Sequence, residues 1–140
     1  MVLDALAALL SLVGLADAVY LTVEHVSGRS VRCTIISGCS EVLSSPYATV
    51  GPVPLAAVGA LAYFAAFSLA TLAAFGYASA RRLLAALACA MCATSLWLLY
   101  LQAFVIRHFC QYCLLSAAIS TSLAVLVIIN LITQRQARTK

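Results

Sequence analysis

The stretch from Phe109 to Gln134, FCQYCLLSAAISTSLAVLVIINLITQ, contains no charged residue and begins with two cysteines three positions apart. A helix needs about 20 mostly apolar residues to cross a bilayer, so this stretch is long enough to span one. We therefore expect a membrane helix over about residues 109–133. Cys110 and Cys113 would lie at its start, near the membrane surface.

The rest of the chain has the composition of a membrane protein as well. It has 140 residues, of which 65% are hydrophobic and 9% are charged. Three further apolar blocks predict helices over about residues 3–25, 51–77 and 82–106, because backbone polar groups in lipid must be satisfied within each span. We expect residues 1–140 to form a single all-α integral membrane domain, a four-transmembrane-helix bundle with no fused thioredoxin-like domain.

Residues 27–50 form the loop between the first two spans, and we expect this loop to contain a short helix. Ser, Gly and Pro residues surround a short apolar stretch there, which is typical of a segment lying at the membrane surface. Pro52 and Pro54 suit the first turn of the following span, where a missing amide hydrogen costs no hydrogen bond.

The basic residues lie near the span ends and indicate the orientation. If the spans alternate, five lie on the side of the termini and three on the side of the loop; the five are Arg81, Arg82, Arg135, Arg138 and Lys140, and the three are Arg29, Arg32 and Arg107. The positive-inside rule then places both termini in the cytoplasm. We expect a multi-pass protein of the cell membrane with the loop and Cys110 extracytoplasmic. The basic residues are scattered, and no nucleic acid partner is expected.

The six cysteines fall into three pairs by their spacing: Cys33 with Cys39, Cys89 with Cys92, and Cys110 with Cys113. The alternation of spans puts the first and third pairs on the same face of the membrane. Ser37 and Gly38 give the loop a place to turn back, as a disulfide with Cα atoms about 5.5 Å apart requires. Free amide hydrogens at a helix start, together with Arg107 and His108, favour the Cys110 thiolate. Two exchangeable pairs on one face can form a relay.

Other interpretations of these residues remain open. Two structural disulfides could staple the bundle. A four-thiolate zinc site is disfavoured by the Cys-x5-Cys spacing, so no metal is expected. Cys89 and Cys92 lie well inside a span and are interpreted as packing residues. Asp17, also inside a span, either transfers protons or hydrogen-bonds to a neighbouring helix.

Three segments in this order carry a resemblance to a known family: GLADAVYLTVEH (14–25), CTIISGCSEVLSSPYATVGPVPLAAVGALAY (33–63) and CQYC (110–113). The chain resembles the vitamin K epoxide reductase (VKOR) family, in its bacterial and archaeal thiol-oxidoreductase branch, over essentially its whole length. The other four-helix thiol oxidase family carries its Cys-x-x-Cys in the first loop instead of at the last helix.

The resemblance implies a quinone-linked membrane thiol oxidoreductase that generates disulfides de novo. A thioredoxin-like partner in trans would give two electrons to a Cys33–Cys39 disulfide, and Cys39 would exchange with Cys110. The Cys110–Cys113 couple would then reduce a membrane quinone, such as menaquinone or ubiquinone, with Cys113 facing it.

The resemblance also implies further site residues. Ser45 matches the family's Ser/Thr position near the redox centre, although a helix cap or a turn before Pro46 would explain it equally. Leu98, Gln102 and Ile106 repeat every four residues and match positions that line the family's quinone pocket, as a core-packing face also would. The residues expected to bind quinone are Cys113, Leu43, Leu55, Leu98, Gln102 and Ile106.

Two alternative functions are a reductase of vitamin K or its epoxide and a disulfide-stapled structural membrane protein. Vertebrate epoxide-reducing members place a Tyr four residues beyond the second cysteine and an Asn in the second helix. Ala117 and Leu55 stand at these positions here, and the only Asn is Asn130 near the opposite surface. This difference argues against epoxide reduction.

Overall fold

The computed structural model describes all 140 residues, Met1 to Lys140. Four segments are long and apolar enough to cross a membrane: α1 (Val2–Val26), α3 (Leu55–Ala74), α4 (Ala78–Tyr100) with the π-helical turn η2 (Leu101–Ile106), and α5 (Gln111–Thr139). The expected all-α membrane bundle is therefore confirmed.

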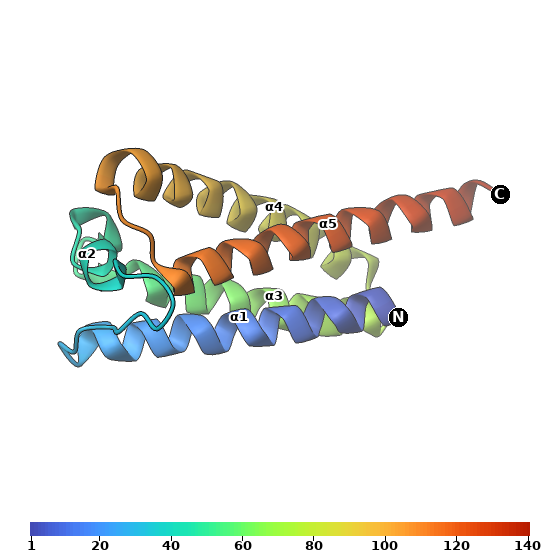
Figure 1. Ribbon diagram of the computed structural model, residues 1–140. Coiled ribbons are helices and arrows are strands. Elements are labelled where there is room, and N and C mark those ends of the chain that lie inside the picture. The colour runs from blue at the N-terminus through green and yellow to red at the C-terminus, as the bar shows by residue number, and fades with distance from the viewer.

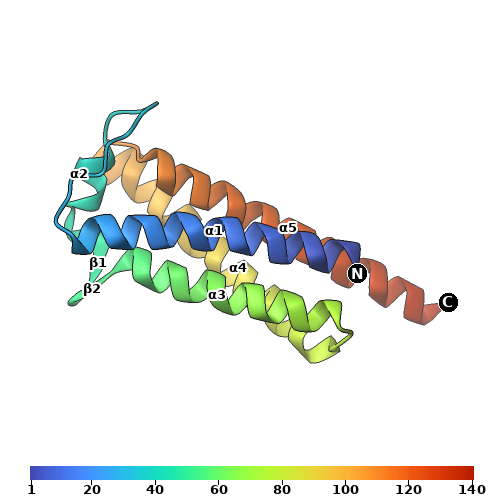
Figure 2. The ribbon, with the colours of Figure 1, turned by 90° about the horizontal axis from the view of Figure 1, so that it is seen from below.

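The four long helices form a closed ring in which each packs against two others. α1 contacts α3 and α5, and α4 contacts the same two helices. Both termini lie at one end of the bundle and the loop that contains α2 (Cys39–Leu43) lies at the other (Figure 1). Seen from below, α1 and α3 lie side by side in front of α4 and α5 (Figure 2). The polypeptide between α1 and α3 thus covers the end away from the termini.

Small residues allow the helices to approach one another closely. Ala66, Ala70 and Ala88 are fully buried in the main core cluster, as expected for membrane helices that associate by packing. Gly14 of α1 lies against the ring of Tyr63 of α3, and a Cβ at position 14 would overlap that ring.

Tyr63 also connects α3 to α5 through its hydroxyl group. Its oxygen lies 2.9 Å from the Ser116 hydroxyl and 3.0 Å from the Ser120 hydroxyl, and it donates to the Ser116 carbonyl at 3.0 Å. Because a buried hydroxyl without a partner is costly, these contacts fix the register of the two helices.

The loop contains more structure than the expected short helix. After α2, the 3-10 turn η1 (Pro46–Ala48) leads into a small antiparallel hairpin of β1 (Thr49–Val50) and β2 (Val53–Pro54). We expected residues 51–54 to form the first turn of the second span, but α3 begins only at Leu55. Proline disfavours helical geometry in the residue before it, which keeps Gly51 and Val53 out of the helix.

A buried polar network closes the end of the bundle that carries the termini. Asp4 of α1 is 1% exposed, and its two carboxylate oxygens each accept a hydrogen bond from Arg81 of α4 at 3.3 Å. Asn130 of α5 donates to Asp4 at 2.8 Å, and Arg81 donates to the Ala73 carbonyl of α3 at 2.9 Å and to Gln134 at 2.6 Å. The network therefore joins all four long helices.

The place of Arg81 differs from the sequence interpretation, which counted its charge among those outside the spans. Arg81 lies in the first turn of α4 and is 8% exposed, whereas the adjacent Arg82 is exposed. The buried Asp4 carboxylate explains the difference, because a buried charge needs a partner of opposite sign.

Replacing Arg81 with Met should lower the free energy of unfolding by about 3–5 kcal/mol, because the Asp4 carboxylate loses its partner inside the bundle. The measurement is reversible unfolding of the purified protein in detergent micelles. Arg82→Met is the matched control and should change the free energy by less than about 0.5 kcal/mol, as for an exposed site. Adding Asp4→Leu to Arg81→Met should restore part of the lost free energy of unfolding, because the unpaired buried carboxylate is then removed. Equal stability of the two single variants would contradict a structural role for the ion pair.

Candidate functional site

The loop cysteines form a disulfide at the end of the bundle opposite the termini. Cys33 and Cys39 are bonded, with their Cα atoms 5.7 Å apart. Cys39 is the first residue of α2 and is buried, whereas Cys33 is half-buried. Gly38, directly before Cys39, has a φ of +142°, a conformation that residues with a Cβ rarely adopt. This glycine allows the chain to turn sharply into α2.

Cys110 lies at the start of α5 and is completely buried. The chain reaches it from η2 through Arg107, whose left-handed conformation (φ +58°) reverses the chain direction. The amide of Cys110 donates a hydrogen bond of 3.1 Å to the side-chain oxygen of Gln102. Gln102 thus holds the N-cap residue of α5 against the end of the preceding helix.

The structure brings the two predicted redox pairs together. Cys39 and Cys110 belong to one buried apolar cluster, and Cys33 and Cys113 pack against it. Cys110 and Cys113 are free thiols here. The backbones before the two buried cysteines nearly touch, since a Cβ added to Gly38 would lie 2.7 Å from the carbonyl oxygen of Phe109.

Gln111, between the two cysteines of α5, fastens the loop to the helix. Its side-chain oxygen accepts hydrogen bonds from the amides of Thr34 and Ile35 at 3.2 and 2.9 Å, and its amide group donates to the Thr34 hydroxyl at 3.2 Å. Sequence reasoning missed this contact. The only available signal was an amide side chain placed between two cysteines.

Local hydrogen bonds activate the Cys110 thiol. A hydrogen bond with the Cys113 side chain makes the largest contribution and lowers the pKa of Cys110 to about 7, although burial acts in the opposite direction. The amide hydrogens of Cys113 and Tyr112 lower this pKa further, as expected at a helix start. We expected Arg107 and His108 to contribute, but neither is among the main causes. The thiolate is favoured chiefly by its own helix turn.

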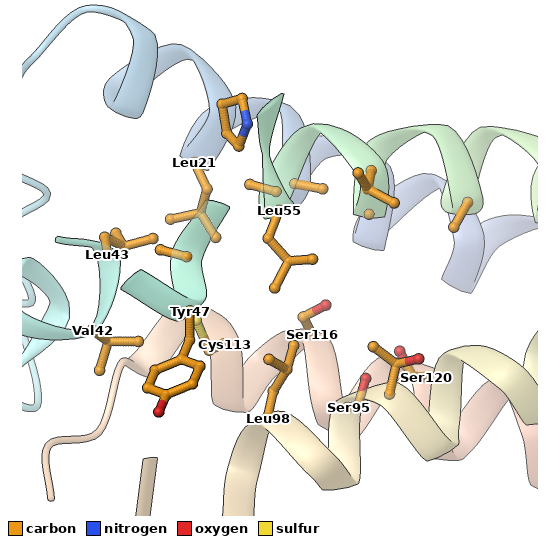
Figure 3. A pocket seen from close by; sticks show the side chains of 18 of the residues that line it. Leu21, Val42, Leu43, Tyr47, Leu55, Ser95, Leu98, Cys113, Ser116 and Ser120 are labelled. Carbon is orange, nitrogen blue, oxygen red and sulfur yellow. The ribbon is translucent and has the colours of Figure 1, made fainter. Parts of the chain in front are cut away.

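An apolar pocket of about 320 Å³ lies beside the cysteines, between α3 on one side and α4 and α5 on the other. Leu55 enters it from α3, Leu98 and Ser95 from α4, and Ser116 and Ser120 from α5 (Figure 3). Its lining includes every residue that the sequence analysis assigned to quinone: Cys113, Leu43, Leu55, Leu98, Gln102 and Ile106. Ser45, Asp17 and His25 line it as well.

Two of these residues have structural contacts of their own. Gln102 is 3% exposed and binds the Cys110 amide, so it belongs to the turn between α4 and α5 as well as to the pocket. The Ser45 hydroxyl donates to the Val42 carbonyl at 2.7 Å, which closes the turn before Pro46. Its oxygen can still accept a hydrogen bond from within the pocket.

Cys89 and Cys92 lie apart from this site and form no disulfide. Cys92 packs against the main core cluster, with its sulfur 3.8 Å from the Thr121 hydroxyl. Cys89, which we also interpreted as a packing residue, is exposed on the outer face of α4. Two residues three positions apart on a helix lie about 60° apart around its axis, so one can face the core while the other does not.

Four membrane helices that hold a disulfide, a free dithiol and an apolar pocket at one end define a membrane thiol-disulfide oxidoreductase. The chain matches the Vitamin K epoxide reductase family over residues 5–128, and it belongs to this family. A search among curated proteins finds no match.

Replacing Gly38 with Ala should move Cys39 away from Cys110, because the new methyl group meets the Phe109 carbonyl oxygen and the backbone conformation becomes strained. In a Cys33→Ala/Cys113→Ala background, only Cys39 and Cys110 remain to pair at this site. Strain of about 1–3 kcal/mol should slow formation of their mixed disulfide under mild oxidation by on the order of tenfold.

Gly51→Ala is the matched control for this experiment. Gly51 also has a positive φ, +62°, but a Cβ there would have no neighbour within 4 Å. Equal trapping rates for the Gly38 and Gly51 variants would mean that the close approach at Phe109 does not position the cysteines.

Proposed function

We propose that the protein is a quinone-linked thiol oxidoreductase that generates disulfides de novo, oxidising a thioredoxin-like partner in trans and reducing a membrane quinone. The observation that carries this proposal is the shared cluster of the two cysteine pairs. Its buried members are Cys39 and Cys110, with Cys33 on the loop side and Cys113 on the pocket side. This order suits the transfer of electrons from an exposed loop, through the buried cysteines, to an apolar pocket.

In the proposed relay, each exchange conserves electrons. A partner dithiol reduces the Cys33–Cys39 disulfide and becomes a disulfide itself. The Cys39 thiolate attacks Cys110 of an oxidised Cys110–Cys113 pair, which releases Cys113. The Cys33 thiolate then attacks Cys39, which restores the loop disulfide and releases Cys110. The helix pair now holds the two electrons.

The pocket has the size and lining that suit a quinone. A cavity of about 320 Å³ lies within the usual range of small-molecule sites, about 300–1,000 Å³. When bound, a quinone supplies an acceptor for two electrons and two protons. Leu43, Leu55 and Leu98 would hold its ring from three sides, and Ile106 would extend this apolar surface.

Cys113 and Ser45 both line the pocket, and they contribute a thiol group and a hydroxyl group to its wall. As the Cys110–Cys113 pair is reoxidised, its two thiols lose two electrons and two protons, and their sulfurs form a bond. We place Ser45 in the site as a polar group beside the redox centre, and its free lone pair supports that assignment.

Reduction of vitamin K or its epoxide is the second candidate in the same family. The position that carries a polar Asn in vertebrate members is Leu55 here, an apolar part of the pocket wall. Ala117, which stands where vertebrate members have a Tyr, is buried and has no polar side-chain group. The pocket therefore supports a quinone acceptor better than an epoxide.

The order of the relay can be tested with single cysteine variants. Cys113→Ala should lower the rate of dithiol-driven quinone reduction by at least about 10³-fold, because it removes the cysteine thiol that lines the pocket. Cys33→Ala should abolish oxidation of reduced thioredoxin, used as the protein probe, but keep dithiothreitol-driven quinone reduction within about threefold of the original rate. The rates are measured on purified protein with a soluble short-chain quinone.

A Cys89→Ala/Cys92→Ala variant is the control and should keep both activities, since its changes lie outside the cluster. Equal loss of the dithiothreitol-driven rate in the Cys33 and Cys113 variants would refute the proposed order.

We further propose that both termini are cytoplasmic and that the redox cysteines are extracytoplasmic. With Arg81 paired to Asp4, the exposed basic residues still favour the end with the termini: Arg82, Arg135, Arg138 and Lys140 there, against Arg29, Arg32 and Arg107 at the loop end. An impermeant maleimide should therefore label reduced Cys33 from outside intact cells, with Cys33→Ala as the unlabelled control. Labelling only in inverted vesicles would reverse this orientation.

A further inference from the structure

Asp17 is a buried carboxylate in α1 that the proposed relay does not use. Its side chain is about nine-tenths buried and it lines the apolar pocket. Its Oδ2 atom is the only buried side-chain polar atom in the protein without a hydrogen-bond partner. Leaving a buried carboxyl oxygen unpaired is costly, and an ionisable group inside a span usually has a function.

The other buried carboxylate of α1, Asp4, has hydrogen-bond partners, so the lack of a partner is specific to Asp17. Asp4, on the same helix, accepts hydrogen bonds from Arg81 and Asn130 and lies 3.4 Å from the amino terminus. The fold therefore satisfies a buried acid completely where the acid has a structural role. At Asp17 the pocket itself lies where a partner would be expected.

On the basis of the proposed function, we propose that Asp17 is the proton-donating residue of the pocket, holding a proton on its carboxyl group and delivering it to an oxygen of the bound quinone. The groups that support this assignment are the unpartnered Oδ2 atom, the apolar lining around it and the thiol of Cys113 in the same pocket. A protonated carboxyl donates one hydrogen bond, which suits a carbonyl oxygen that is gaining electrons.

The proton balance closes within the site. Reoxidation of the dithiol releases two electrons and two protons as the bond between the sulfurs of Cys110 and Cys113 forms. Asp17 gives its proton to the acceptor and regains one from these thiols, so its own state is unchanged after a full cycle. The second proton leaves the thiols for the acceptor as well.

The other titratable groups around the pocket are less suited to this step. The Tyr63 hydroxyl is already bonded to Ser116 and Ser120. His25 lies about two helical turns from Asp17 toward the loop, and the Tyr47 side chain is exposed. The charge of Asp17 also opposes the Cys110 thiolate. The protonation states of the two groups are therefore coupled.

Infrared difference spectroscopy tests this proton directly, without quinone. The chain has only four acidic side chains, so a protonated-carboxyl band can be assigned by substitution. We expect such a band in the protein both with its helix pair reduced and with it oxidised, as the difference between the spectra of the original protein and of each variant. Asp17→Asn should abolish the band and Asp4→Asn should retain it. A spectrum without an Asp17-dependent band in either redox state would overturn the proposal.

Kinetics supply the second measurement. Asp17→Asn should lower kcat for dithiothreitol-driven reduction of a short-chain quinone by about 100-fold or more, the usual effect of losing a general acid. Reduction of the Cys33–Cys39 disulfide by dithiothreitol should be unchanged. Asp17→Leu should be equally slow yet unfold at no lower temperature, which a purely structural residue would not show.

Ser11→Ala, which alters a buried side chain six residues earlier on α1, is the matched control and should be fully active. An Asp17→Asn variant with kcat within about twofold of the original would overturn the proposed role of Asp17 but not the proposed function of the protein. Absence of quinone reduction by the unaltered protein would instead overturn the proposed function, and the role of Asp17 with it.

Discussion

The buried ion pair between Asp4 and Arg81 is the interaction on which the rest of the bundle depends. Apolar helix faces gain little from packing together inside lipid, so close contact and interior polar bonds must hold the helices. This pair and its neighbours reach all four long helices through the Ala73 carbonyl and Asn130. With one end closed in this way, the other end can hold a pocket between the helices without the bundle separating.

A second constraint acts at the opposite end, where two turns of chain meet. Gly38 and Phe109 approach so closely that no Cβ fits between them. The next residue along the chain from each is a cysteine: Cys39 is the first residue of α2, and Cys110 is the N-cap residue of α5. Because each cysteine is fixed by the helix that it begins, the backbone contact sets the position of both sulfurs. Gln111 then fastens the remaining part of the loop.

The sequence predicted the helices and the cysteine pairs better than the contacts between them. Long uncharged stretches specify membrane helices by length alone, and the resemblance placed Leu55 and Leu98 beside the pocket that they line. It could not show that Arg81 pairs with Asp4, because these residues lie 77 positions apart and charge at a span end normally reports topology. The bond from the Cys110 amide to Gln102 followed from no spacing rule either, because it depends on the chain reversal at Arg107.

Burial gives the four sulfurs different chemical surroundings, and these surroundings support the proposed direction of transfer. Cys39 and Cys110 are buried, so their thiolates can exchange with each other but are out of reach of a thiol on a folded partner protein. Cys33 and Cys113 lie at the two edges of the cluster, toward the exposed loop and the apolar pocket respectively. In the proposed relay, a thioredoxin-like protein thus reaches only the loop edge, and a membrane-soluble acceptor reaches only the pocket edge. The proposed relay therefore carries electrons given up at the loop to the acceptor through the two buried sulfurs.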